Sequence, residues 1–248
     1  METSIGIVGA EGRMGRAIAQ LAAAEGVRIA GGIDRGAGAD DLSGLARDAD
    51  VMIDFSSPDP LQRTLAAARE AGTPLLIGTT GLAPEHHAAI DAAAGDIPIL
   101  QTANTSLGVT LLSALVEQAA RRLGPDWDIE IVEMHHRHKR DAPSGTALLL
   151  GAAANLGRGA TGPGEFDRLD RMGEGAGVRE EGGIYYASLR GGSVAGDHQV
   201  ILATDGERIE LGHRAESRAI FARGALRAAL WLVGRASGRY TMGDVLGL

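Results

Sequence analysis

The order of elements at the start of the chain constrains its fold more than any other feature. Ile5 to Val8 is a short apolar run that predicts a buried strand, and the turn from Gly9 to Gly15 reads G-A-E-G-R-M-G before an alanine-rich helix. Glycines in such a turn tighten it, let the backbone approach a pyrophosphate and let the helix pack closely on the sheet. The spacing is G-x-x-G-x-x-G rather than G-x-G-x-x-G, so an ordinary tight turn is the alternative interpretation.

The second predicted strand strengthens the dinucleotide interpretation of that turn. It spans Val27 to Ile33 and ends at Asp34 and Arg35. An acidic residue about 20 positions beyond the glycine turn can bind the hydroxyl groups of the adenosine ribose, and a neighbouring arginine can bind a 2′-phosphate. The turn and this pair together predict a dinucleotide-binding βαβ unit.

Strands alternate with helices through the next part of the chain. Further predicted strands span Val51–Phe55, Leu75–Ile77 and Ile97–Leu100. This alternation predicts a doubly wound α/β domain whose parallel sheet is covered on both faces. The loops at 56–57, 78–80 and 102–105 then follow the carboxyl ends of strands, where ligands bind in such sheets. Taken singly, each loop could be an ordinary polar turn.

The second half of the chain predicts a mixed sheet outside the parallel one, and therefore a second domain. Its predicted elements are a helix over Val109–Leu123, a strand over Asp128–Met134, a helix over Thr146–Leu156, antiparallel strands over Tyr185–Arg190 and Gln199–Ala203 joined through Gly191-Gly192, and a strand over Ile209–Leu211. Residues 157–183 hold nine glycines, which predicts a mobile lid or a disordered connector. An amphipathic helix over 217–233 is expected to pack back on the first domain.

A cluster of acid–base residues follows the strand that ends near Met134. His135, His136 and His138 precede Lys139, the only lysine in a chain whose other basic residues are arginine. A lysine is a compact charge that can exchange a proton, which arginine does not readily do. After the cluster, residues 143–146 read P-S-G-T and predict a helix N-terminus whose free amides can hold an anion.

Acid–base groups beside an anion-binding helix end predict an active site for a small carboxylate. The alternatives are a solvated basic loop and, for His135, a buried histidine bonded to a backbone carbonyl. His86 and His87 are expected on a solvated helix face, because neither has a cysteine or a spaced carboxylate as a partner for a metal. We therefore expect no metal site.

Composition excludes several other classes of protein. The formal charge of −8 over 248 residues argues against binding to nucleic acid or to anionic membranes. No apolar run approaches the roughly 18 residues needed to span a bilayer, and the first strand begins too early to leave room for a signal peptide. The absence of cysteine excludes disulfides and thiolate chemistry. We expect a cytoplasmic enzyme.

Three motifs together resemble those of the dihydrodipicolinate reductase family, also called the 4-hydroxy-tetrahydrodipicolinate reductases of diaminopimelate and lysine biosynthesis. The motifs are V-G-A-E-G-R-M-G over 8–15, G-T-T-G over 78–81 and E-M-H-H-R-H-K-R-D-A-P-S-G-T over 133–146. The resemblance covers nearly the whole chain. It implies a Rossmann-like domain of residues 1–106 plus 216–248, and an α+β domain of residues 107–215 with a mixed open sheet for substrate binding and tetramerisation.

The resemblance also implies a reaction and a set of site residues. Hydride would pass from NADPH or NADH to the ring of a cyclic imine dicarboxylate, with His135 and Lys139 as proton donors. The substrate-binding residues would be His136, Ser144, Gly145 and Thr146. The cofactor-binding residues would be Gly9, Ala10, Glu11, Gly12, Arg13, Met14, Asp34, Arg35, Gly78, Thr79, Thr80, Thr102, Ala103, Asn104 and Thr105.

We expect use of both cofactors, because Asp34 favours NADH and Arg35 tolerates NADPH. Two other functions stay open at this point. One is a related reductase of another imine or semialdehyde, such as an aspartate dehydrogenase-like enzyme. The other is a dinucleotide-sensing module without turnover, in which changes at His135 or Lys139 would not affect binding.

Overall fold

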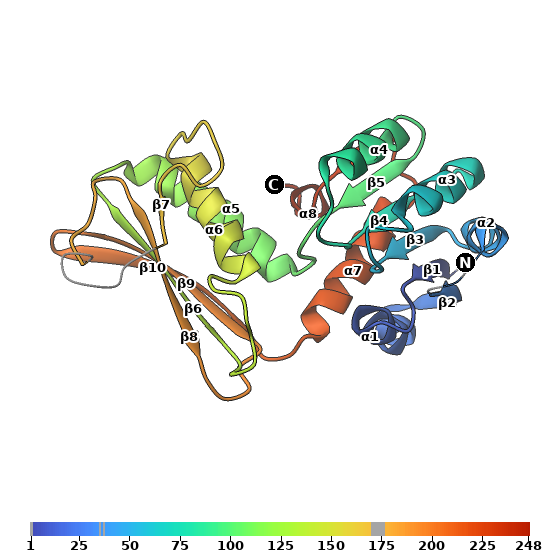
Figure 1. Cartoon of the computed structure of the whole chain (residues 1–248), viewed down its shortest axis with the longest axis horizontal. Coiled ribbons are helices and arrows are strands. Elements are labelled where there is room, and N and C mark those ends of the chain that lie inside the picture. The colour runs from blue at the N-terminus through green and yellow to red at the C-terminus, as the bar shows by residue number, and fades with distance from the viewer. Residues whose placement is uncertain (1, 35, 37, 170–176) are drawn as a thin grey trace. The chain divides into compact units, whose positions relative to one another are not determined.

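The computed structural model describes residues 2–34, 36, 38–169 and 177–248, and divides the chain into two compact units. The first unit consists of Met1–Leu107 and Ala219–Leu248, and the second of Gly108–Arg218. Figure 1 shows a separate sheet in each unit. No helix within the described ranges is long and apolar enough to cross a membrane.

The sheet of the first unit has six parallel strands in the order β11-β5-β4-β3-β1-β2. The strands are β1 (Thr3–Val8), β2 (Val27–Ile33), β3 (Val51–Asp54), β4 (Leu75–Ile77), β5 (Pro98–Gln101) and β11 (Gly238–Tyr240). The helices are α1 (Arg13–Ala22), the short 3₁₀ helix η1 (Ala23–Glu25), α2 (Ala39–Asp48), α3 (Leu61–Ala71), α4 (Pro84–Ala94), α7 (Ala219–Leu232) and α8 (Met242–Leu246).

Helices cover both faces of this sheet, as expected for near-continuous apolar strands. On one face, the strand residues Ile5, Ile53 and Leu76 share a buried cluster with residues of α1, α7 and α8. On the other face, Met52 and Ile99 share a second cluster with α2, α3 and α4. The prediction of a doubly wound α/β sheet is confirmed, and α7 packs on it as expected.

The strand order reverses between β1 and β3, because β1 pairs with β2 on one side and with β3 on the other. Ligands of doubly wound sheets bind at the carboxyl ends of the strands at such a reversal. The glycine turn after β1 and the loop after β3 both lie there. The fold therefore brings together two of the loops that the sequence singled out.

Two further parts of this sheet domain have no counterpart among the predicted elements. The segment after residue 34 forms α2, whose apolar residues Leu42 and Leu45 are buried against the sheet. The end of the chain forms β11 and α8, and β11 adds a sixth strand beside β5. At three and five residues, β11 and α8 are too short for periodicity alone to reveal them.

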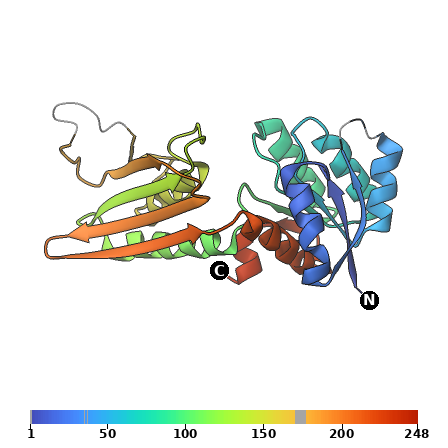
Figure 2. The same ribbon diagram turned by 90° about the horizontal axis from the view of Figure 1, so that it is seen from below.

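The second unit holds a mixed sheet in the order β10-β9-β6-β8-β7. Its strands are β6 (Asp128–His135), β7 (Asp167–Arg168), β8 (Ile184–Arg190), β9 (Gly196–Thr204) and β10 (Glu207–Ala215), and its helices are α5 (Leu107–Leu123) and α6 (Gly145–Gly157). Figure 2 shows the long antiparallel hairpin of β9 and β10 in orange. Both helices bury their apolar residues against the same sheet cluster, which includes Ile129, Ile131 and Val200.

One predicted pairing in this unit is wrong. The strands β8 and β9 were expected to form a hairpin through Gly191-Gly192, but β6 lies between them, parallel to β8 and antiparallel to β9. Alternation of apolar residues fixes the face that a strand buries, but it does not identify the neighbouring strand. The connection over 191–195 is long enough to pass around the end of β6.

The glycine-rich segment is partly fixed to this unit. Asp167 Oδ1 accepts hydrogen bonds from Asn155 Nδ2 and from the Tyr186 hydroxyl, both at 2.8 Å. Arg168 Nε donates to Glu180 Oε2 at 2.6 Å. These contacts order the two flanks of residues 170–176, and those residues themselves lie outside the described part of the chain.

Candidate active site

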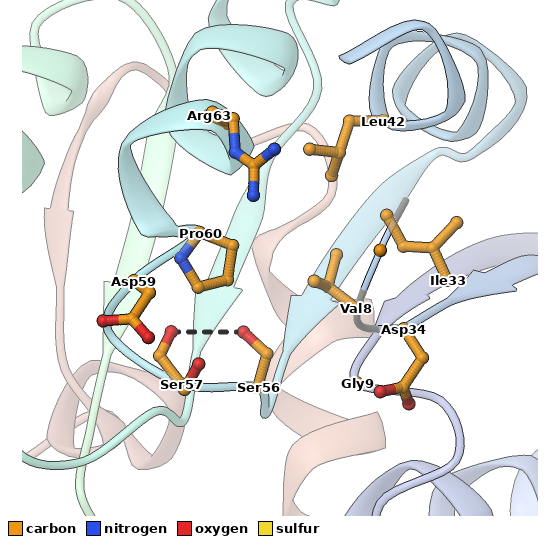
Figure 3. Close-up of a pocket in the computed structure, with 11 residues that line it drawn as sticks. Val8, Gly9, Ile33, Asp34, Leu42, Ser56, Ser57, Asp59, Pro60 and Arg63 are labelled. Carbon is orange, nitrogen blue, oxygen red and sulfur yellow. Dashed lines mark hydrogen bonds between the residues drawn. The ribbon is translucent and has the colours of Figure 1, made fainter. Parts of the chain in front are cut away.

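A cleft opens beside the strand-order reversal of the first unit. Its cavity of about 430 Å³ is bounded by the ends of β1 and β2, by α2 and by the start of α3. Figure 3 shows Asp34 and Gly9 at one side of this cleft and Arg63 with Ser57 at the other. The lining residues are Val8, Gly9, Ile33, Asp34, Gly36, Leu42, Ser56, Ser57, Asp59, Pro60 and Arg63.

The glycine turn is built so that the backbone itself forms the wall of the site. A Cβ at Gly15 would lie 2.3 Å from the Gly9 carbonyl oxygen, and a Cβ at Gly9 would lie 2.8 Å from the Phe55 oxygen. Gly9 also has a φ of +84°, which side chains disfavour. These glycines are therefore required by the close packing of turn, helix and neighbouring loop, as a dinucleotide cradle needs.

Asp34 lies against that cradle. Its Oδ2 accepts a hydrogen bond from the Glu11 amide at 2.8 Å, which ties the end of β2 to the glycine turn. The carboxylate is thus placed where an adenosine ribose would meet the turn. The predicted cofactor residues Gly9, Ala10, Glu11, Gly12, Arg13 and Met14 all lie in this turn and the first turn of α1. Arg35 lies outside the described residues.

Two further loops follow β4 and β5 in the same sheet. The Thr79 hydroxyl donates to the Asp54 carboxylate at 3.0 Å, and the Thr105 hydroxyl donates to the Phe221 carbonyl at 2.7 Å. Both hydroxyl hydrogens are therefore used inside the unit. Thr80 and Ala103 are exposed, and Gly78 is buried against Phe55, while Thr102 and Asn104 hydrogen-bond each other within their loop.

Asp54 connects the loops after β3 and β4 through hydrogen bonds of its buried side chain. It was not among the predicted site residues. The residue is fully buried at the end of β3, and its Oδ1 accepts hydrogen bonds from the Ser56 amide and hydroxyl. Burial raises the pKa of Asp54, although hydrogen bonds from Ser56, Thr79 and Thr64 act in the opposite direction. Asp54 therefore holds the loop after β3 and the loop after β4 together.

The second unit positions the histidine cluster through the alternation of β6. Ile129, Ile131, Glu133 and His135 all point to the face that α5 and α6 cover, because side chains alternate along a strand. His135 is the last residue of β6 rather than part of the following loop, where the sequence placed it, and it is 8% exposed. The expectation for the loop holds for the rest of the cluster, from His136 to Lys139.

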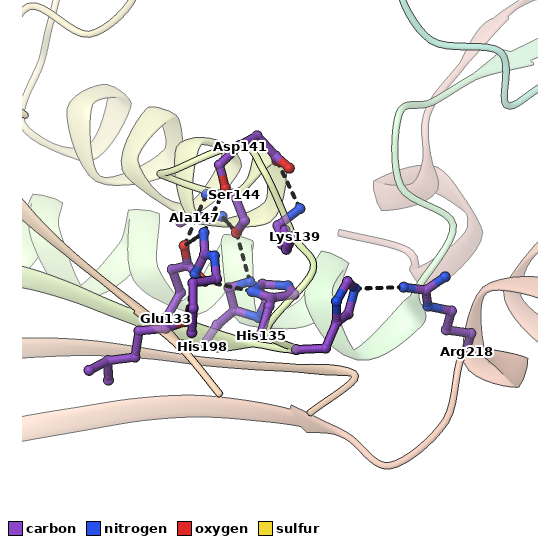
Figure 4. A network of polar contacts seen from close by, with 11 residues as sticks. Glu133, His135, Lys139, Asp141, Ser144, Ala147, His198 and Arg218 are labelled. Carbon is purple, nitrogen blue, oxygen red and sulfur yellow. Dashed lines mark hydrogen bonds and ion pairs between the residues drawn. The ribbon is translucent and has the colours of Figure 1, made fainter. Parts of the chain in front are cut away.

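Glu133 is the centre of a polar network in this unit (Figure 4). Its two oxygens accept hydrogen bonds from Arg190 Nη1 at 2.9 Å and from Arg190 Nη2 at 2.8 Å. Oε2 also lies 2.5 Å from His135 Nδ1, and Oε1 accepts from the Ser144 amide at 3.2 Å. Burial opposes the charge of Glu133, but the bonds from Arg190, Ser188 and His135 outweigh it and lower its pKa.

This pairing determines which ring nitrogen of His135 is left to exchange a proton. The Glu133 carboxylate is ionised, so His135 Nδ1 donates its hydrogen to it. The exchangeable site of the imidazole is then Nε2. A Cβ at Gly196 would lie 3.0 Å from Nε2, so the glycine there keeps this nitrogen open. The arrangement resembles the base-and-orienter pairs of other acid–base sites.

The remaining cluster residues lie close to this pair. Lys139 Nζ forms an ion pair with Asp141 Oδ2 at 2.8 Å. His136 Nε2 lies 3.0 Å from Arg218 Nη2, and because the guanidinium can only donate, this nitrogen is the acceptor. Burial and the nearby cations, Arg218 first among them, lower the pKa of His136. His136 is thus held in its neutral form next to an arginine.

The predicted helix start is confirmed. Ser144 is the N-cap of α6, and its Oγ accepts a hydrogen bond from the Ala147 amide at 3.1 Å. Gly145 and Thr146 are the first two residues of the helix. The N-terminal end of a helix carries partial positive charge and favours an anion.

Arg190 and His198 belong to this network and were not predicted as site residues. Arg190 comes from β8, and His198 from β9, where its Nε2 lies 3.1 Å from Ser144 Oγ. Both residues are more than 50 positions from β6 in the sequence. Only the strand order of the mixed sheet brings them beside Glu133 and His135.

The fold and the two sites define a two-domain reductase type, with a dinucleotide-binding sheet in one unit and an acid–base site in the other. Family models for dihydrodipicolinate reductase match both units, the N-terminus over residues 3–105 and the C-terminus over residues 108–246. The chain belongs to the dihydrodipicolinate reductase family.

Curated relatives agree with this assignment. A 4-hydroxy-tetrahydrodipicolinate reductase of Zymomonas mobilis is 55% identical over 254 residues, covering 98% of this chain and 97% of the relative. One of Methylocella silvestris is 50% identical, covering 98% and 96%. Among solved structures, a dipicolinate-bound dihydrodipicolinate reductase from Paenisporosarcina sp. TG-14 has a TM-score of 0.79 at 23% identity and covers 100% of both chains. That similarity confirms the fold.

Proposed function

We propose that the protein reduces 4-hydroxy-tetrahydrodipicolinate to tetrahydrodipicolinate with NADH or NADPH, in the biosynthesis of lysine and diaminopimelate. The reaction adds one hydride and one proton to the substrate and releases one water. The observation that carries the proposal is the Glu133–His135 pair beside the capped start of α6, in a chain of this family. Family membership favours this function over the aspartate dehydrogenase-like and sensing alternatives.

His135 supplies the proton in this proposal. When bound, the nicotinamide supplies the hydride to the ring of the substrate. The enamine carbon that results needs a proton, and His135 Nε2 is the nitrogen left for it because Glu133 holds Nδ1. Glu133 also stabilises the imidazolium form, so that the histidine is charged before the proton leaves. The unperturbed pKa of a histidine, about 6.5, suits proton transfer near neutral pH.

Lys139 acts in the step in which the substrate loses its hydroxyl group. A hydroxyl group leaves the substrate most easily when it departs as water, and an ammonium group can donate the required proton. The ring gives up one C–H proton in the same dehydration, so this step consumes no proton overall and the reaction adds only the hydride and the proton from His135. In the structure the ammonium is held by Asp141 at 2.8 Å, and its side chain is 20% exposed. A dicarboxylate substrate would compete with Asp141 for this cation.

In this proposal, the start of α6 and His136 in the loop after β6 bind the carboxylates of the substrate. The Gly145 and Thr146 amides lie in the first turn of the helix, with Ser144 as the cap. Such amides and the positive end of the helix stabilise an anion. His136, bonded to Arg218, contributes a second polar group from the loop.

The cofactor is held by the first unit. The glycine turn would carry the pyrophosphate, Asp34 the adenosine ribose, and the cavity of about 430 Å³ the adenine. Gly78, Thr79, Thr80, Thr102, Ala103, Asn104 and Thr105 would lie toward the nicotinamide. We propose use of both NADH and NADPH, with Asp34 favouring the former and Arg35 admitting the latter. From the family resemblance we also propose a cytoplasmic homotetramer.

Cofactor oxidation at 340 nm tests the function, with substrate formed in place from pyruvate and aspartate semialdehyde by the preceding synthase. Wild type is expected to turn over with both cofactors. Lys139→Ala is expected to lose about 10²-fold or more in kcat, while Arg140→Ala, its exposed neighbour, stays within about threefold. No turnover of wild type with either cofactor would overturn the proposed function.

A further inference from the structure

His198 occupies a position between the two parts of the candidate site in the second unit. It lies directly opposite Glu133 in the pairing of β6 with β9, and it is 5% exposed. Its ring packs edge-on against the ring of His135, with centroids 5.0 Å apart and an interplanar angle of 74°.

His198 also contacts the cap of α6. Its Nε2 lies 3.1 Å from Ser144 Oγ, which accepts a hydrogen bond from the Ala147 amide at 3.1 Å. A neutral imidazole can accept the serine hydrogen at Nε2 or, in its other tautomer, donate to the second lone pair of the serine oxygen. In either tautomer the ring is bonded to the serine that caps α6.

The surroundings of His198 favour the same neutral form. The charged and titratable groups around it are Glu133 and His135 from β6, His213 from β10 and Lys139 from the loop after β6. Burial and the positive neighbours lower the pKa of His198 to about 4, and only Glu133 acts in the opposite direction among the nearest groups. A neutral His198 adds no positive charge beside His135 and Lys139, both of which must carry a proton to react.

We propose that His198 is a positioning residue whose neutral imidazole holds the ring of the proton donor His135 and the Ser144 cap of α6 in register. The proposal rests on the proposed function. Loss of the ring would loosen the proton donor and the carboxylate-binding amides together. Both kcat and the affinity for a dicarboxylate would then fall, whereas cofactor affinity would not.

Three variants test this role. His198→Leu removes the hydrogen bond to Ser144 and leaves an apolar side chain, His198→Gln restores a hydrogen-bonding group for Ser144, and His213→Leu is a matched control on the neighbouring strand. We expect His198→Leu to lose about tenfold in kcat and about tenfold in affinity for the probe pyridine-2,6-dicarboxylate, measured calorimetrically with NADH present. His198→Gln and His213→Leu should remain within about threefold of wild type. A purely structural role would instead lower the melting temperature without this recovery by glutamine.

An arm without substrate separates this proposal from the proposed function. In ¹⁵N-edited NMR spectra of the ligand-free protein, the His198 ring should stay neutral from pH 8 to about pH 5, and the Ala147 amide should shift in His198→Leu and return toward wild type in His198→Gln. Wild-type kinetics without turnover would contradict the function alone. A His198 that titrates like an ordinary histidine, or a His198→Leu variant with wild-type kcat, probe affinity and Ala147 shift, would overturn the positioning role.

Discussion

At the scale of single residues, Glu133 is the buried charge around which the second-unit site is arranged. A carboxylate that is 1% exposed is stable only when its hydrogen-bonding capacity is filled, and Glu133 accepts from Arg190, His135 and Ser144. Removing its charge takes away the carboxylate that accepts from both Nη atoms of Arg190. Through its contact with Nδ1, Glu133 also orients the proposed proton donor His135.

Glu133→Gln is predicted to destabilise the protein by about 2–4 kcal/mol at pH 7, measured by urea unfolding. Because the fold lowers the pKa of Glu133, its contribution is present above the unfolded pKa of about 4.3 and is lost as pH falls through the lower folded value. The difference between wild type and Glu133→Gln should therefore shrink below about pH 4. The exposed Glu85→Gln on α4 is the control, and an equal loss there would contradict this account.

The buried His198 also makes the stability of the protein depend on pH. Its folded pKa of about 4 lies below the unfolded value of about 6.5, so the unfolded chain binds more protons between these values and stability falls as pH falls. Between pH 7 and pH 4 this costs wild type about 3 kcal/mol that His198→Gln does not lose. Parallel urea titrations at the two pH values measure it. Identical losses in both proteins would show that His198 is not held neutral by the fold.

The residues of the site divide sharply into those that sequence could reveal and those it could not. His135, Lys139 and Ser144 lie within ten positions, so their spacing alone indicates a common site. Arg190 and His198 reach it only through the order of strands in the mixed sheet. A usable signal did exist for Glu133, because alternation along β6 puts it on the same face as His135.

At the scale of elements, two helical glycines of the first unit differ in whether a side chain would fit. Both Gly15 in α1 and Gly44 in α2 are helical, but a Cβ at Gly15 would lie 2.3 Å from the Gly9 oxygen, while a Cβ at Gly44 would meet nothing within 4 Å. The first glycine is therefore required by the turn, and the second only lowers helix stability.

Gly15→Ala is predicted to weaken NADH binding by tenfold or more, since the turn must shift to admit a methyl group. Gly44→Ala should bind NADH as wild type does and gain about 0.5–1 kcal/mol of stability. Fluorescence titration with NADH and thermal unfolding of both variants make the comparison. Equal NADH affinities for the two variants would contradict the role given to the glycine turn.

The sequence patterns predicted the parallel sheet better than the mixed sheet. The strand–turn–helix start and the alternation over the first hundred residues predicted the parallel sheet correctly, because each βαβ crossover constrains the next strand. The direct pairing of β8 with β9 was predicted incorrectly, since antiparallel and mixed sheets admit several orders for the same set of strands. The sixth strand, β11, is three residues long and forms only because β5 offers an edge.

At the scale of the whole molecule, the two proposed ligand sites belong to different compact units. The glycine turn, Asp34 and the cleft belong to the first unit, and the histidine network belongs to the second. A ligand stabilises the parts of a protein that must be folded to bind it, by about 2.7 kcal/mol at a hundredfold excess over Kd. Each ligand should therefore stabilise mainly the unit that binds it.

Hydrogen exchange followed by mass spectrometry is predicted to show this division. NADH alone should slow exchange most in the glycine turn and around Gly78–Thr80, while pyridine-2,6-dicarboxylate added to that complex should protect the loop from His136 to Thr146. Gly15→Ala, with its weakened cradle, controls for non-specific protection by NADH. Equal protection by NADH over β6, β9 and β10 would contradict the assignment of cofactor binding to the first unit.

The central claim is that His135, oriented by Glu133, delivers the proton that completes reduction. The most direct measurement is kcat of His135→Gln against wild type, at saturating cofactor and with the cofactor Kd measured in parallel. His135→Gln is expected to lose about 10²-fold or more in kcat with an unchanged Kd, while the exposed His138→Gln stays within about threefold. A His135→Gln variant within about threefold of wild type would contradict the claim.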